Sequence, residues 1–402
     1  MTPEKYLESV MPTREEVDAF VERGQGPDRV SRNGGFNYDP ELGWIHTHAV
    51  REDGVDASKT FLSYESDQAR HVIHYADRQC RIHTFGDSFT HCDQVNDGET
   101  WQEYLAGHLQ EPVRNYGVGG YSVYQAYLRM KRVEATRSAQ HIILNIYDHD
   151  HHRNLFRWWA INFGQRVECG FTSPHLKINV AEDRVEEMPN LLNRAEDVYK
   201  LCDPDWVIET FRNDPILPIA FTRRHPEWAT RNTVEQVASG FGLTSEQVAD
   251  ASPLEAIEKL ALAAALFATR HVVLKVEEFV RGTGKKLFVI LSHCAPYTAN
   301  VLAGKPRWDQ GFLNFIRGRG YPVIDMRDAF AVEYAMCKVD PSDYLRKYYN
   351  SHHSPAGNYF MAWAIKDEIV KWLDPKPLPY GPRGEDIRVQ HDGWKPAQTA
   401  PR

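Results

Sequence analysis

Ser88 is the residue of this chain best placed to act as a nucleophile. It stands in the tetrapeptide Gly86-Asp87-Ser88-Phe89, directly after the run 80–85, in which apolar residues alternate with polar ones. The run predicts a β-strand, and Gly, Asp and Ser all favour a turn after it. A serine on such a turn is expected to be exposed, and backbone N–H groups there point toward a bound ligand. The competing interpretation is an ordinary turn serine.

Two later segments hold groups that would complete a site of this kind. The segment 113–121 runs from a short predicted strand into Gly117, Gly119 and Gly120. The segment 350–358 stands just before a predicted helix at 356–372 and contains His352 and His353. A hydroxyl is a poor nucleophile at neutral pH until an adjacent imidazole removes its proton. A histidine beside Ser88 would supply such an imidazole.

In order and context, the segments 86–89, 115–121 and 350–358 resemble the motifs of the SGNH (GDSL-type) hydrolases. The resemblance spans residues 80–150 and 285–372. It implies that Ser88 attacks an acyl carbon and that His352 takes the proton of the serine. His352 is preferred to His353 because it stands three residues before the proline of a Pro-x-Gly turn, as the histidine of the family commonly does.

The resemblance also implies an oxyanion hole made of the Ser88 N–H group, the Gly120 N–H group and an asparagine side chain. At the position of that asparagine the chain has His149, within Asp148-His149-Asp150. A neutral imidazole can donate one hydrogen bond, with a different reach and pH dependence.

The family's carboxylate often stands two or three residues before the histidine, where this chain has Tyr349 and Asn350. We therefore expect a Ser-His dyad. Asn350 could hold the imidazole through its carbonyl oxygen, although it would not stabilise the imidazolium as a charge does. A backbone carbonyl, or Asp340 or Asp343, could assist instead.

The remaining site candidates are polar or aromatic residues near these segments. The tract 148–154 is rich in Asp and His, but consecutive residues seldom converge on one ion, so we favour a polar loop lining the cleft and expect no metal or cofactor. The rings that follow at 156–163 could stack on sugars or pack an insertion onto the core. Asp87 is also expected to hold the turn in place. The expected substrate-binding set is Asp87, Tyr121, Asp148, Asp150, Trp158, Trp159 and His353.

Composition limits the partners and the compartment. The chain has 402 residues and a net charge of -8 without long blocks of one sign, which argues against nucleic acid and anionic membranes as partners. We expect a small-molecule or glycan substrate. Six scattered cysteines fit reduced thiols, and the start of the chain lacks a signal-like segment, so a cytoplasmic protein is expected.

The order of predicted elements indicates an α/β fold with a three-layer, flavodoxin-like parallel sheet flanked by helices. Residues 1–79 form an N-terminal helix, at 13–23, and an apron; residues 80–154 and 285–373 form the SGNH-like core. Residues 155–284 are a mainly helical insertion that ends in a long helix from about 253 to 281. Residues 374–402 are a proline-rich arm, which could wrap a neighbouring subunit in a homo-oligomer.

Three functions follow as hypotheses. The first is a serine hydrolase that cleaves an ester, an O-acyl group such as acetyl on a carbohydrate, through Ser88 and His352. The second is a glycan-cleaving hydrolase or lyase on the same fold, with Asp148, Asp150 or the histidines of 148–152 as acid and base. The third is a non-catalytic glycan-binding module, which the presence of both Ser88 and His352 disfavours.

Overall fold

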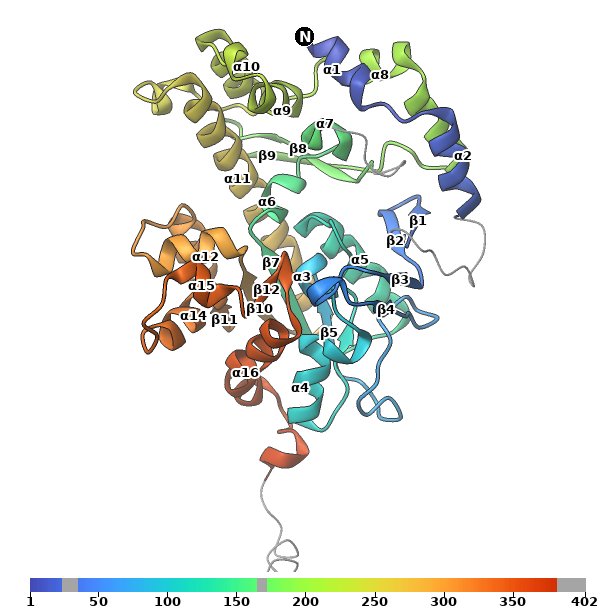
Figure 1. Cartoon of the computed structure of the whole chain (residues 1–402), viewed down its shortest axis with the longest axis vertical. Coiled ribbons are helices and arrows are strands. Elements are labelled where there is room, and N and C mark those ends of the chain that lie inside the picture. The colour runs from blue at the N-terminus through green and yellow to red at the C-terminus, as the bar shows by residue number, and fades with distance from the viewer. Residues whose placement is uncertain (24–34, 165–171, 382–402) are drawn as a thin grey trace, which may run out of the picture.

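A five-stranded parallel sheet forms the centre of the molecule (Figure 1). The structure is a computed structural model and describes residues 1–23, 35–164 and 172–381. The strands lie in the order β11-β10-β7-β5-β6. If the five strands are numbered 1 to 5 along the chain and the sheet is followed from its β6 edge, this order is 2-1-3-4-5. The expected α/β fold with a parallel sheet is therefore confirmed. The strands are β5 (Ile82–Phe85), β6 (Arg114–Asn115), β7 (His141–Tyr147), β10 (Lys286–Ser292) and β11 (Val323–Asp325).

Alternate residues of the central strand β7 face opposite helix layers. Ile142, Leu144 and Ile146 belong to the core cluster that contains α5 (Val123–Thr136) and α11 (Pro253–Gly282). Ile143 belongs to a second cluster, with α4 (Trp101–Leu109), α14 (Met326–Tyr334) and α16 (Pro355–Trp372). Both faces of the sheet are therefore covered, as its almost wholly apolar strands require. The shorter helices of this part are α3 (Ser88–His91), α6 (Asp150–Arg153), α12 (Ala295–Leu302), α13 (Gln310–Arg317) and α15 (Pro341–Leu345).

The helix α16 begins where a small hairpin ends. Ser354 caps it by accepting a hydrogen bond from Gly357 N, and Pro355 occupies its first turn. The hairpin before it consists of β12 (Tyr349–Asn350) and β13 (His352–His353). A Cβ atom at Gly357 would lie only 2.1 Å from the Tyr348 carbonyl oxygen, so a glycine is needed to let the hairpin rest on the helix.

The N-terminal helices pack on the insertion. The predicted helix is confirmed as α2 (Arg14–Arg23), with a capping box in which Thr13 N donates to Glu16 Oε2 and Glu16 N to Thr13 Oγ1. A further helix, α1 (Pro3–Val10), precedes it, and Tyr6 donates to the Ile161 carbonyl oxygen. The apron contributes two hairpins, β1 (Phe36–Asp39) with β2 (Gly43–His46), and β3 (Ala49–Arg51) with β4 (Thr60–Leu62).

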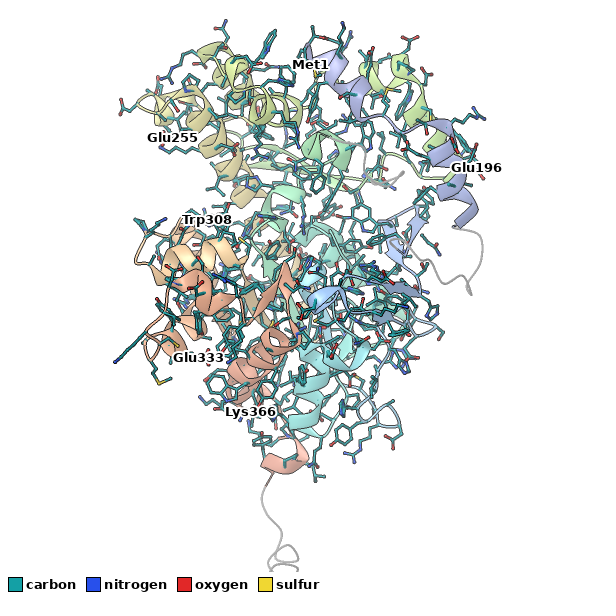
Figure 2. The ribbon with its side chains drawn as sticks, viewed as in Figure 1. Met1, Glu196, Glu255, Trp308, Glu333 and Lys366 are labelled. Carbon is teal, nitrogen blue, oxygen red and sulfur yellow. The ribbon has the colours of Figure 1, made fainter. Side chains whose placement is uncertain are left out.

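The insertion forms the upper part of the view in Figures 1 and 2. Besides helices it contains an antiparallel hairpin, which the sequence did not predict. Its last helix, α11, begins at Pro253 after the Ser252 cap, as predicted, and its second half reaches the sheet through Val272, Val276 and Val280. Its other elements are α7 (Trp159–Phe163), β8 (His175–Asn179), β9 (Arg184–Met188), α8 (Pro204–Phe211), α9 (Ile216–Arg224) and α10 (Arg231–Gly240).

Three remaining observations concern the whole chain. Within the described ranges, none of the helices combines the length and apolar character needed to cross a bilayer. The five cysteines of those ranges are free thiols. Most of the predicted C-terminal arm, residues 382–402, lies outside the described residues.

Candidate active site

The turn that carries Ser88 follows the carboxyl end of β5. Gly86 is required there, because a Cβ atom would lie 2.1 Å from Thr90 Oγ1 and 2.6 Å from the Asn145 carbonyl oxygen. Asp87 accepts a hydrogen bond from Phe89 N at 2.9 Å, and α3 begins at Ser88. The site lies between β5 and β7, the point at which the strand order of the sheet reverses, where open α/β sheets bind ligands.

Ser88 and His352 meet at this edge of the sheet. His352 Nε2 lies 2.9 Å from Ser88 Oγ, although the two residues are 264 positions apart. The β12–β13 hairpin presents His352, with Ser351 in the left-handed conformation at its turn (φ 66°). Phe89 packs near the His352 ring with centroids 5.1 Å apart. The two side chains lie within hydrogen-bonding distance, as a nucleophile and its base require, but Ser88 is only 5% exposed, which corrects the expectation of an exposed serine.

The other nitrogen of His352 faces Gln94 rather than Asn350. Gln94 Oε1 lies 3.1 Å from His352 Nδ1 and also accepts the His352 backbone N–H group at 3.0 Å. Gln94 Nε2 donates to the Asp53 carbonyl oxygen at 3.1 Å, and Asn350 Nδ2 donates to the same oxygen at 3.1 Å. The expected contact from Asn350 to the imidazole is therefore replaced: Asn350 braces the Asp53 backbone, and Gln94 holds the ring.

The two upstream aspartates serve other purposes. Asp340 caps α15 by accepting a hydrogen bond from Ser342 N at 2.8 Å. Asp343 pairs with Arg346 on the surface. Both carboxylates are thus committed locally, and the expectation that one of them assists His352 is not met.

A carboxylate does lie near His352, without a hydrogen bond to it. Asp93 Oδ1 lies 2.6 Å from His91 Nδ1 and 3.6 Å from Arg51 Nη1. Burial alone would raise the pKa of Asp93, but the charges of His91, Arg51 and His352 and the His91 hydrogen bond hold it well below its usual value. These interactions favour the charged form of Asp93, which also interacts electrostatically with the His352 ring.

A second acidic pair lies on the other side of Ser88. Ser88 Oγ lies 3.3 Å from Asp87 Oδ2, and Arg153 Nη1 joins Asp87 Oδ2 at 3.2 Å to Asp150 Oδ1 at 2.7 Å. Burial raises the pKa of Asp87, and burial followed by the charge of Asp87 raises the pKa of Asp150 well above its usual value. Both aspartates are fully enclosed, so their role here is to hold Arg153 rather than to line an open cleft.

The loop after β6 carries the candidate oxyanion glycine. Val118 N donates to the Gly86 carbonyl oxygen at 3.1 Å, which ties this loop to the Ser88 turn. Gly119 N donates to His46 Nε2 at 2.9 Å, and Gly120 follows with φ 82°, a conformation that favours glycine. Within the described part of the chain, the N–H groups of Ser88 and Gly120 donate to no protein acceptor. These two donors remain available for a ligand oxygen.

Besides Asp87 and Asp150, four more of the expected substrate-binding residues lie inside the protein. Tyr121 donates to the Trp44 carbonyl oxygen at 2.6 Å, and Trp158 packs on Phe211. His353 is 2% exposed and packs against Phe89 and Tyr349. These three residues therefore stabilise the walls of the site.

Asp148, the fourth, belongs to a buried ionic network behind the site. Asp148 Oδ1 lies 2.6 Å from His293 Nδ1, and His293 Nε2 lies 2.9 Å from Asp325 Oδ1. Burial alone would lower the pKa of His293, but the two carboxylates raise it to about 9. Asp148 thus fixes the start of α12, where its second oxygen also accepts Cys294 N at 2.9 Å.

A cavity of about 330 Å³ adjoins the site, and His149 and Trp159 both line it. Arg153, which binds Asp87, forms part of the same wall. Trp159 also covers Gly120, since a Cβ atom there would lie 2.9 Å from the indole ring. The His149 ring is exposed, and among the described residues its nitrogens have no hydrogen-bond partner. The lining residues are His149, His152, Arg153, Phe156, Trp159, Asn162, Phe163, Arg223, Glu258 and Tyr297.

Among the described residues, one group of potential metal ligands lies beneath the glycine loop. Ligand atoms of His46, His91 and Asp93 lie within 4.8 Å of one another. His91 is already bonded on both nitrogens, to Asp93 at 2.6 Å and to the Tyr64 hydroxyl at 2.7 Å. The His46 and His91 rings stack at 3.9 Å with an angle of 19° between them, so their in-plane lone pairs do not converge. The cluster is suited to supporting the loop rather than to holding an ion.

Sequence reasoning missed Gln94, Asp93, His46 and Arg153. Asp93 and Gln94 stand only five and six residues after Ser88, which is the one local signal that could have drawn attention to them. The chain has no match among protein-family models or curated proteins.

Proposed function

We propose that this protein is a serine hydrolase of the SGNH type that cleaves an ester bond. The observation that supports this proposal most directly is the 2.9 Å contact between Ser88 Oγ and His352 Nε2 at the strand-order reversal of the sheet. The two unengaged N–H groups of Ser88 and Gly120 add a place for the oxyanion.

The reaction would proceed in two steps. His352 Nε2 takes the proton of Ser88 while Oγ attacks the ester carbonyl carbon; the ester C–O bond breaks, and the alcohol leaves with the proton from His352. A water molecule then gives a proton to His352 and attacks the acyl-Ser88 carbon. The C–Oγ bond breaks, the proton returns to Ser88, and the acid is released.

The developing negative oxygen would be bound by the N–H groups of Ser88 and Gly120, with His149 as the third donor. The imidazolium would be oriented by Gln94 Oε1 and stabilised through space by Asp93, whose charge is fixed by His91 and Arg51. In this arrangement orientation and charge come from two different residues. A single triad carboxylate would supply both.

The alcohol part of the substrate would occupy the 330 Å³ cavity beside Arg153. Its mixture of rings, such as Trp159 and Tyr297, with Arg and His side chains fits a carbohydrate, whose faces are apolar and whose rim is polar. Trp159 leaves little room above Gly120, which favours a small acyl group such as acetyl.

Labelling and turnover test the proposal. A fluorophosphonate should label Ser88, and p-nitrophenyl acetate turnover should fall at least about 1,000-fold in Ser88→Ala and His352→Gln. Ser342→Ala, at an exposed serine of α15, is the matched control and should retain full turnover. Unchanged turnover in folded Ser88→Ala would overturn the proposal.

The two alternative functions have weaker support. Glycosidic cleavage through Asp148 and Asp150 would need carboxyl groups that reach the substrate, and these carboxyl groups are enclosed and bound to His293 and Arg153. A glycan-binding module would explain the cavity but would leave the contact between Ser88 and His352 without a purpose. Sugar binding without any ester turnover is the result that would favour the module.

A further inference from the structure

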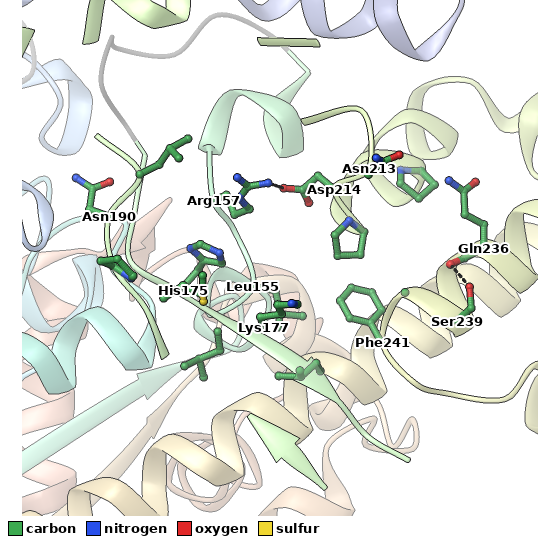
Figure 3. Close-up of a pocket in the computed structure, with 18 of the residues that line it drawn as sticks. Leu155, Arg157, His175, Lys177, Asn190, Asn213, Asp214, Gln236, Ser239 and Phe241 are labelled. Carbon is green, nitrogen blue, oxygen red and sulfur yellow. Dashed lines mark hydrogen bonds and ion pairs between the residues drawn. The ribbon is translucent and has the colours of Figure 1, made fainter. Parts of the chain in front are cut away.

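A second and larger cavity, of about 740 Å³, lies within the insertion (Figure 3). The β8–β9 hairpin forms one side of it, and the region from the start of α9 to the end of α10 forms the other. It shares a wall with the candidate active site: Leu155 and Arg157 line this cavity, whereas Arg153 and Phe156 line the smaller one. The larger cavity plays no part in the chemistry proposed for Ser88.

Asp214 and Arg157 form an ion pair in the wall of this cavity. The residue is 3% exposed, and its Oδ1 accepts a hydrogen bond from Ile216 N at 2.9 Å. Its Oδ2 is buried and accepts no hydrogen bond in the described structure, and Arg157 Nη1 lies 3.5 Å away. Figure 3 shows Arg157 and Asp214 meeting across the cavity. Arg157 Nη1 also donates to the Thr210 carbonyl oxygen at 3.1 Å, whereas in the described structure Arg157 Nε and Nη2 donate to no protein acceptor.

The surroundings of this pair are amides and apolar surfaces. Asn213 and Gln236 lie on the Asp214 side of the cavity in Figure 3, and Phe241 contributes a ring below them. On the hairpin side, Leu176 and Ile178 are buried and form part of the apolar lining. The cavity thus combines planar polar groups, which can donate and accept in pairs, with surfaces that suit C–H groups.

We propose that this cavity binds a neutral sugar of one or two rings. Hydroxyls of a sugar can accept from the N–H groups of Arg157 Nε and Nη2, which the Asp214 ion pair holds in place, and the amides can bond further hydroxyls. The apolar face of the ring would lie against Phe241. An acyl chain would cover Arg157 and the amides without forming hydrogen bonds with them, and an anionic ligand would meet the Asp214 charge.

The inference does not require Ser88 to be catalytic. If both proposals hold, the larger cavity would hold a sugar unit next to the one being deacylated, since residues 153–157 separate the two cavities. A purely binding protein would use the same cavity.

Titration of the full chain with maltose, cellobiose, xylobiose and chitobiose tests the proposal, with binding followed by saturation-transfer NMR and calorimetry. At least one disaccharide should bind with a Kd on the order of 1 mM or tighter. Asp214→Asn should weaken that binding at least about tenfold. Asp205→Asn, an exposed aspartate of the neighbouring helix α8, is the matched control and should not change it.

Two further variants make the outcome decisive. Gln236→Ala alters an exposed residue of α10, so it should weaken binding without affecting folding. Ser88→Ala should bind sugar as the unaltered protein does, which separates this proposal from the hydrolase proposal. Absence of binding by all four disaccharides at about 10 mM, binding unaffected by Asp214→Asn and Gln236→Ala, or preferential binding of decanoate would each overturn the inference.

Discussion

One side-chain oxygen, Gln94 Oε1, accepts both the backbone N–H group of His352 at 3.0 Å and its ring Nδ1 at 3.1 Å. Because an amide oxygen can only accept, the proton of the neutral ring must sit on Nδ1. Nε2 is then unprotonated toward Ser88, as a general base requires. Gln94 therefore sets the tautomer of His352 without adding a charge.

Gln94→Glu should add the missing charge. We expect kcat/KM for p-nitrophenyl acetate to rise about tenfold, because a carboxylate stabilises the imidazolium. The acidic limb of the pH profile should move to higher pH for the same reason. Gln110→Glu, at an exposed position after α4, is the control. An unshifted pH profile in the folded variant would contradict the role assigned to Gln94.

Gly120→Ala should reduce turnover about 100-fold, since its Cβ atom would lie 2.9 Å from Trp159 and φ is 82°. The displaced N–H group would no longer face the oxyanion. Gly107→Ala is the matched control, because a Cβ atom at that site on α4 meets nothing within 4 Å. Steady-state kinetics and a melting curve distinguish a loss of turnover from a loss of folding. Equal activity of the Gly120→Ala and Gly107→Ala variants would show that Gly120 is not part of the site.

His46→Ala should lower kcat about tenfold with little change in KM. The His46 ring accepts the Gly119 N–H group at 2.9 Å, so its loss would loosen the neighbouring Gly120 donor. His46→Gln retains an acceptor and should restore part of the rate. If Ala and Gln variants of equal thermal stability have equal kcat, His46 does not position the loop.

The ionic network around His293 should make stability depend on alkaline pH. The folded pKa of about 9 is higher than the ordinary value of 6.5, so the stabilisation is complete below pH 6.5 and is lost as pH rises through 9. The amount is on the order of 3 kcal/mol. In urea unfolding, the difference between the unaltered protein and His293→Gln should be large at pH 6 and narrow toward pH 9.5. A difference that does not depend on pH would contradict the stabilising role assigned to charged His293.

Acidification should destabilise the protein for the opposite reason. Burial lowers the pKa of His91 and His151 to about 4 and that of His353 to about 3. Below pH 6.5 these histidines bind protons in the unfolded chain but stay neutral in the folded protein. The free energy of unfolding therefore falls as pH decreases from 6.5. Each ring should cost roughly 2 kcal/mol at pH 5. Urea midpoints between pH 7 and 5 measure the loss, and a flat profile would contradict it.

Local patterns in the sequence were sufficient to predict much of the fold. The apolar run before Ser88 predicted a strand, and the cap at Ser252 predicted the start of a helix. Both signals lie within a few neighbouring residues, and both elements are present as β5 and α11. The contact between Ser88 and His352 was expected from the resemblance of three segments, in their order and context, to the motifs of the SGNH hydrolases.

Contacts between residues far apart in the sequence could not be predicted from such local patterns. Gln94 reaches His352 because its own backbone is left-handed (φ 71°) and because a hairpin 258 positions away meets it. Asp148 was expected in the cleft, but its partner His293 stands 145 positions downstream. Trp158 and Trp159 are adjacent, yet one packs on Phe211 and the other lines the cavity.

The continuous helix α11 has a consequence for how a substrate enters. Its 30 residues correspond to about 45 Å, and they join the insertion to the sheet as one rod without a break. Such a rod resists bending, so a hinge motion of the insertion about the middle of α11 is disfavoured. Substrates should therefore be selected by the fixed width of the entrance to the site, and a densely substituted polymer would have to enter by one chain end.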